Sequence, residues 1–283
     1  MTSSHVEILI WGKEPEPGLF YDEKGRRKDA SPPSSMAAFL GFTELRPHTA
    51  AAFCLRVYNH HYTHSENPGA PATPIDPDRY VVVDISIYKR RFSLQHESVV
   101  FHLQVPGDQG PEDVYILADR NIDAALLSLS SQSQSQKLAA DTTYFLQAAE
   151  PPGHLYGSLI WTMTMPVPSG TFNFRFNLAQ LATLLSAVSN ADGEYDVMKK
   201  NCYWFTRMVR ELVIRIINAA RVVPAQPQEI IPLPVDHSRY LWRTGCFLGL
   251  FHLDGYSNDL AQNAYTKYVN EYQNFLNEVT LAF

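Results

Sequence analysis

Cysteine is scarce in this sequence. The 283 residues include only three cysteines, Cys54, Cys202 and Cys246. Their wide spacing and odd number argue against a disulfide framework and against a cysteine-rich zinc site. We therefore expect free thiols in a reducing compartment.

Clustered positive charge and long apolar runs are also missing. The formal net charge is -6, and the 23 lysines and arginines are scattered along the chain. Neutralising phosphate groups needs clustered basic residues, so we expect no nucleic-acid partner. No apolar run reaches the length of about 18 residues that a membrane span needs, and the first residues lack the charged and apolar regions of a secretory signal. We expect a cytoplasmic protein with no integral membrane segment.

Several enzyme signatures are absent. The sequence has no glycine-rich phosphate loop, no Gly-x-Ser-x-Gly elbow, no kinase signature and no HExxH motif. A compact histidine tract, His60, His61 and His64, would suit a metal if it were helical. Because it has no matching carboxylate motif, we interpret it as a solvated loop. We expect neither a metal nor a cofactor.

The chain divides into three regions. Residues 1–79 form an N-terminal arm and linker, partly irregular, with proline-rich stretches at 12–35 and 67–78. Residues 80–222 form the core domain, and residues 223–283 form a proline-rich connection and a C-terminal helix. With 45% hydrophobic residues, the chain is long enough to bury one substantial core.

Apolar runs predict a sheet in the core domain. Segments rich in Val, Ile, Tyr and Phe indicate strands at residues 80–88, 98–105 and 114–117, with a further pair at 156–165 and 171–176. The connections between the first three are short, which favours antiparallel pairing.

Amphipathic helices follow the strands. The first starts at Asn177, a good N-cap residue, and ends near residue 190. The second covers residues 201–220 with one apolar stripe, and a closing helix covers residues 258–283. These elements predict an α+β fold in which a mainly antiparallel sheet packs against helices.

Cys202 is the residue that points most directly to chemistry. If Asn201 caps the second helix, Cys202 lies in the first turn, where unpaired backbone N–H groups and the helix dipole favour an anion. The thiolate is the nucleophile of a Cys/His dyad, and a nearby imidazole favours it. Helical spacing puts Cys202 on the side of Phe205 and Val209, within reach of a base on an adjacent strand. A buried core cysteine is the alternative, and it is our interpretation of Cys246.

The motif Asn-Cys-Tyr-Trp-Phe at residues 201–205 resembles the Asn-Cys-x-x-Phe element of NlpC-type peptidases in their permuted forms, of the lecithin:retinol acyltransferase group and of the PPPDE isopeptidases. It is also similar to a group of fungal proteins that carry the same five residues. The resemblance covers residues 80–220 and implies a permuted papain-like arrangement. In such an arrangement a histidine precedes the cysteine and begins a strand. Here that histidine would be His96, directly ahead of the strand at 98–103.

The third catalytic residue is less clear from the resemblance. Retinol-type acyltransferases carry a second histidine about one strand further on. No histidine lies in residues 114–120 here, and Asp119 is the nearest polar substitute. His102 is the other candidate to orient the imidazole, since it lies six residues after His96 on the same face of a regular strand. His154 is a rival base.

The resemblance implies a cysteine-dependent hydrolase or acyltransferase acting on a peptide, an isopeptide or an acyl ester. Cys202 would attack the carbonyl, His96 would transfer the proton, and backbone N–H groups near Cys202 would stabilise the oxyanion. Asn201, Tyr203 and Trp204 would contact the substrate, although Trp204 is also typical of a core aromatic. The alternative is a catalytically inactive member of the fold that acts as a protein-interaction module. The expected partner is a peptide, protein or acyl substrate.

Overall fold

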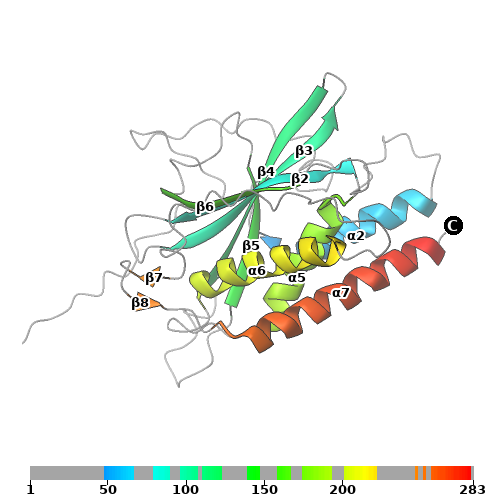
Figure 1. The fold of residues 1–283 in the computed structure, drawn as a ribbon. Helices are drawn as coiled ribbons and strands as arrows, with labels where there is room; N and C mark the ends of the chain where they lie inside the picture. Colours follow the sequence, from blue (N-terminus) through cyan, green and yellow to red (C-terminus); the bar gives the residue numbers. More distant parts are fainter. Residues whose placement is uncertain are drawn as a thin grey trace, which may run out of the picture.

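The computed structural model shows an α+β fold in which helices gather on one side of an antiparallel sheet (Figure 1). It confirms the predicted fold class at this level. The residues that the structure describes are 48–66, 79–89, 96–107, 110–122, 139–146, 158–166, 174–192, 201–221, 246–247, 251–252 and 256–281.

The sheet has six strands, and every neighbouring pair is antiparallel. The strands at 80–88, 98–105, 114–117 and 156–165 were predicted at the correct places. In order across the sheet the strands are β1 (His48–Thr49), β5 (Ala139–Leu146), β4 (Gly110–Ile122), β3 (Glu97–Gly107), β2 (Val81–Lys89) and β6 (Ser158–Thr164). A separate two-stranded pair joins β7 (Cys246–Phe247) to β8 (Phe251–His252).

Three parts of the sheet differ from the prediction, and the first is the short edge strand β1, which was not predicted. Strand β5 was not predicted, because its sequence AADTTYFL interrupts the apolar pattern with polar residues. The predicted strand at 171–176 is not a strand in its described part, residues 174–176. The next residue, Asn177, forms a single bridge with Val81 of β2, and helix α5 begins directly after it.

Four helices of the described residues pack beside the sheet. Asn177 caps α5 as predicted, because its side chain accepts a hydrogen bond from the backbone N of Gln180 at 2.8 Å. The predicted closing helix is also present. The helices are α2 (Ala50–Glu66), α5 (Leu178–Ala191), α6 (Cys202–Arg221) and α7 (Asn258–Leu281).

One buried cluster joins the sheet to all four helices. Alternate residues of β3, Val99, Phe101 and Leu103, lie in the same cluster as Phe205 of α6. The cluster also contains Phe53 and Val57 of α2, and Ala261, Ala264, Tyr268 and Phe275 of α7. The predicted N-terminal arm therefore contributes a core helix, and the C-terminal helix shares the core of the sheet domain.

Within the described ranges, no helix is both long enough and apolar enough to cross a bilayer.

Candidate active site

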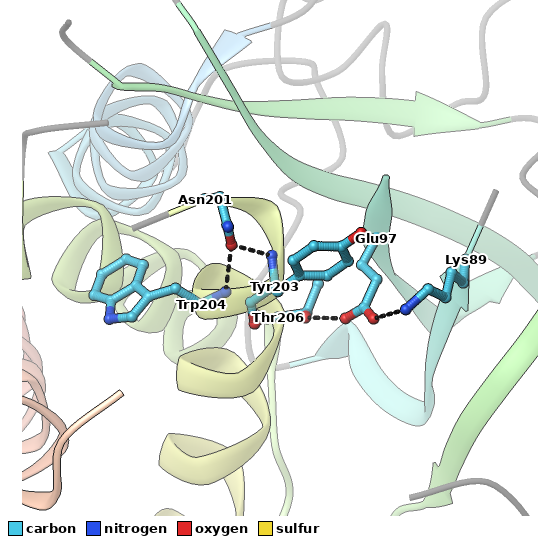
Figure 2. Close-up of polar contacts among 6 residues, drawn as sticks. All are labelled: Lys89, Glu97, Asn201, Tyr203, Trp204 and Thr206. Carbon is cyan, nitrogen blue, oxygen red and sulfur yellow. Dashed lines mark hydrogen bonds and ion pairs between the residues drawn. The ribbon is translucent and has the colours of Figure 1, made fainter. Parts of the chain in front are cut away.

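Asn201 sets the start of helix α6. Its side-chain oxygen accepts hydrogen bonds from the backbone N of Tyr203 at 3.0 Å and of Trp204 at 3.2 Å, as Figure 2 shows. Its carbonyl accepts the first bond within the helix, from Phe205 at 3.1 Å. The predicted cap is therefore confirmed, and Cys202 is the first residue of the helix. At this position the positive end of the helix dipole favours a thiolate.

His96 lies immediately before β3 and is held by a carboxylate of the next strand. Its Nε2 is 3.2 Å from Oδ2 of Asp119 on β4. The other carboxylate oxygen accepts a hydrogen bond of 2.7 Å from the hydroxyl of Thr142 on β5. Thr142 is the register partner of Asp119, so neighbouring strands hold this carboxylate in place.

His96 also lies close enough to Cys202 for the charge of the sulfur to act on the imidazole. Burial alone would lower the pKa of His96. The charge of Cys202, the hydrogen bond that His96 donates to Asp119 and the charge of Asp119 outweigh burial and raise this pKa to about 10. The imidazolium form is therefore favoured at neutral pH, next to a sulfur at a helix N-terminus. Three side chains that are far apart in the sequence thus lie at one site, where Asp119 pairs with His96 and Cys202 acts on it by its charge.

The residues that follow His96 and Asp119 point to the helix side of the sheet, as strand alternation requires. Glu97 accepts a hydrogen bond of 2.9 Å from Thr206 of α6. Arg120 stacks its guanidinium 4.6 Å from the ring centroid of Trp204 and pairs with Asp141 at 3.2 Å. Each strand therefore offers one side chain to the candidate site and the next one to the helix that carries Cys202.

The three residues predicted to contact substrate have structural roles in this site. Trp204 is fully buried in the core, with 0% exposure, so it does not line a groove. Tyr203 is buried beneath Lys89, whose Nζ lies 4.8 Å from its ring centroid. Asn201 uses its side chain as the helix cap. The core interpretation therefore replaces substrate contact for Trp204, whereas substrate contact by Asn201 and Tyr203 stays a prediction.

His102 does not contact His96. Its Nε2 is 2.8 Å from Asp113 and its Nδ1 is 3.5 Å from Asp84, and its ring stacks on Tyr115 with centroids 4.7 Å apart. Six residues of strand separate the two histidines by about 20 Å. The predicted alternative of His102 as the orienting group is therefore wrong, and Asp119 is the residue beside the imidazole.

The other candidates lie away from this site or outside the described side chains. His154 falls outside the described residues, and so does the side chain of Cys246. The tract of His60, His61 and His64 was predicted to be a loop. This prediction is wrong, because the tract is part of helix α2. Among the described residues, no group of three or more His, Cys, Asp or Glu side chains is arranged to hold a metal.

Sequence reasoning missed the supporting polar residues, Glu97, Arg120, Asp141, Thr142 and Thr206. Their one local signal is a charged or polar residue inside, or directly beside, an otherwise apolar strand or stripe. That signal does not tell which distant residue each one contacts.

The Asn201 cap gives a testable link between helix and thiol. Asn201→Ala is expected to lower the free energy of unfolding by about 1 kcal/mol and to slow alkylation of Cys202, because the first turn that favours the anion loosens. Asn177→Ala removes the equivalent cap of α5 and should lower stability without changing Cys202. Denaturant unfolding and peptide-mapped alkylation measure the two effects. Equal alkylation rates in both variants would contradict a role for the α6 terminus.

No protein-family model, no curated protein and no solved structure matches the chain. The candidate residues Cys202, His96 and Asp119 are held by three separate elements. These are the first turn of α6, the residue before β3, and the adjacent strand β4.

Proposed function

We propose that this protein is a cysteine-dependent hydrolase or acyltransferase in which Cys202 is the nucleophile. His96 is the general base and acid, and Asp119 orients its imidazole. The observation that carries the proposal is that His96, paired with Asp119 at 3.2 Å, lies beside the sulfur of Cys202 at the capped start of α6. This is the relation of nucleophile, base and orienting group that nucleophilic catalysis requires.

The reaction would proceed in two steps. The thiolate of Cys202 attacks the carbonyl carbon of the substrate, and the imidazolium of His96 protonates the leaving amine or alcohol as it departs. The product is a thioester on Cys202. His96 then removes a proton from water, in a hydrolase, or from an acceptor nucleophile, in an acyltransferase. Attack on the thioester releases the acyl product and restores the thiol.

The helix terminus limits which groups could stabilise the oxyanion. The side chain of Asn201 already accepts the N–H groups of Tyr203 and Trp204. The backbone N–H of Cys202 lies in the same first turn and is not one of the two that the Asn201 side chain accepts. We assign this N–H group as one of the two donors of the oxyanion site. The sequence had suggested only that backbone N–H groups near Cys202 would stabilise the oxyanion.

The chain order supports a permuted papain-like arrangement. His96 begins a strand, Asp119 follows on the antiparallel neighbour, and Cys202 comes last, on a helix that packs against the same two strands. This is the order that the resemblance to permuted NlpC-type peptidases, the retinol acyltransferase group and the PPPDE isopeptidases implies. On that basis the substrate class is a peptide, an isopeptide or an acyl ester.

Acylation by p-nitrophenyl acetate tests the proposal. The wild-type protein should transfer an acetyl group to Cys202, detected by peptide mass, and should release p-nitrophenolate at least about a hundredfold faster than Cys202→Ser or His96→Ala. Cys54→Ser is the control, because that thiol lies in the core away from His96. Release at the same rate in wild type and in Cys202→Ser would exclude a catalytic Cys202 for this ester.

A second candidate function is a protein-interaction module that keeps the fold without catalysis. The observation that favours it is access, since Cys202 is only 5% exposed. Under this alternative the acetyl group would not accumulate on Cys202, and His96→Ala would leave ester release unchanged. The same experiment therefore separates the two functions.

A further inference from the structure

Glu97 is a buried carboxylate directly beside the candidate base. It follows His96 in the chain, and its side chain is completely buried. Lys89 of β2 pairs with it at 3.0 Å, and the hydroxyl of Thr206 on α6 donates to its other oxygen at 2.9 Å, as Figure 2 shows. One carboxylate therefore connects two strands to the helix that carries Cys202.

The contact between Glu97 and Thr206 lies close in the chain to both His96 and Cys202. Thr206 is four residues after Cys202, one helical turn further along α6 and on the same face. A second contact comes from Lys89, whose Nζ lies 4.8 Å from the ring centroid of Tyr203 in the first turn. We call Lys89, Glu97, Tyr203 and Thr206 the Glu97 clamp. It joins the residue after His96 to the turn that begins with Cys202.

Stability alone does not explain why the Glu97 clamp is charged and buried. A buried ion pair gains little net free energy over apolar residues of the same volume, because both charges lose their hydration. Helix α6 already has an apolar stripe that packs on the sheet, through Phe205, Met208 and Val209. Such a stripe tolerates small sliding and rotation, whereas a hydrogen bond to a fixed carboxylate does not.

We propose that Glu97 and Thr206 are positioning residues that hold the sulfur of Cys202 at the distance and angle that the imidazole of His96 requires. This inference rests on the proposed function and adds to it the device that sets the geometry of the dyad. Site geometry must be held to within about 0.5 Å for such chemistry. The Glu97 clamp supplies that precision from the side of the sheet opposite to Asp119.

Thr206→Val tests the inference, because it removes the hydroxyl and keeps the side-chain shape. At pH 7 the alkylation rate of Cys202 by iodoacetamide should fall about tenfold. Near pH 10 the rate should approach that of wild type, since an unassisted thiol is then ionised. Thr206→Ser restores the hydroxyl and should restore most of the rate.

Thr183→Val is the matched control. Thr183 is equally buried in helix α5, and its hydroxyl bonds a backbone carbonyl of its own helix and the Tyr58 hydroxyl at 2.6 Å. Removing it should lower the unfolding free energy about as much as Thr206→Val does, while Cys202 keeps its wild-type rate at pH 7. A merely structural role of Thr206 would give the two variants the same alkylation profile.

The outcomes separate this inference from the proposed function. Slow alkylation in Thr206→Val with recovery at high pH, absent from Thr183→Val, supports the positioning role. If Thr206→Val matches wild type at pH 7 while His96→Ala is slow, the positioning role is overturned and the dyad stands. If wild-type Cys202 reacts no faster than Cys54, both are overturned together.

Discussion

Iodoacetamide will modify Cys202 at least about a hundredfold faster than Cys54 at pH 7. The two thiols are nearly equal in access, with exposures of 5% and 7%. Their surroundings differ, because burial raises the pKa of Cys54 to about 12 despite the hydrogen bond from Tyr58, whereas Cys202 lies at a helix N-terminus beside His96. Any preference for Cys202 therefore reports its chemistry and not its exposure. Peptide mapping after short exposures measures the two rates separately.

His96→Ala should remove most of this preference at neutral pH. The pKa of His96 in the folded protein is raised from 6.5 to about 10. The imidazolium therefore stabilises the folded state fully below about pH 6.5, and this contribution is lost as the pH rises through about 10. The ratio of wild-type to variant rates should accordingly be largest near pH 7 and shrink toward pH 10. Equal rates for the two proteins at pH 7 would argue decisively against a dyad.

Arg120→Met will lower the free energy of unfolding by about 3–5 kcal/mol at pH 7. The Arg120 side chain is completely buried and pairs with Asp141, which is also buried, and it donates to the carbonyl of Asp192. Burial raises the pKa of Asp141 to about 6, and the charge of Arg120 opposes that rise. Without Arg120, the protein must keep an unpaired buried carboxylate or protonate it. Urea unfolding measures the loss.

Two comparisons isolate the buried pair. Arg215→Met removes a guanidinium that bonds Gln262 and Asn258 at an exposed junction of α6 and α7, and it should cost about 1 kcal/mol or less. The deficit of Arg120→Met should shrink as the pH falls from 7 toward about 6, because Asp141 without the opposing charge of Arg120 is protonated at a higher pH than in wild type. A loss below about 1 kcal/mol at pH 7 would show that the buried pair between β4 and β5 contributes little to stability.

Local pattern was sufficient to predict α6 and its cap. An asparagine before an apolar stripe of helical period specifies where the helix starts, and the structure places the start at Cys202. Strands β2, β3 and β4 were similarly visible, because runs of Val, Ile and Phe have few other stable conformations in a core. His96 could be placed at the start of β3 for the same reason.

The contacts of the site were not visible in the same way. Both Asp119 and His102 were compatible with orienting His96, and only the pairing of β3 with β4 brings Asp119 to the histidine. The bond between Glu97 and Thr206 joins residues 109 positions apart. Strand β5 was not predicted because its polar residues interrupt the apolar pattern. One of them, Thr142, bonds Asp119 of the neighbouring strand β4.

Asn201, the apolar stripe of α6 and the strand that follows His96 depend on neighbours within a few residues, where capping bonds and side-chain periodicity act. They could therefore be predicted from the order of residues alone. The chain from Cys202 through His96 to Asp119, the Glu97 clamp and the burial of Trp204 depend on strand register and helix packing. Those are set by long-range burial of the whole core, which brings together residues that no local pattern connects.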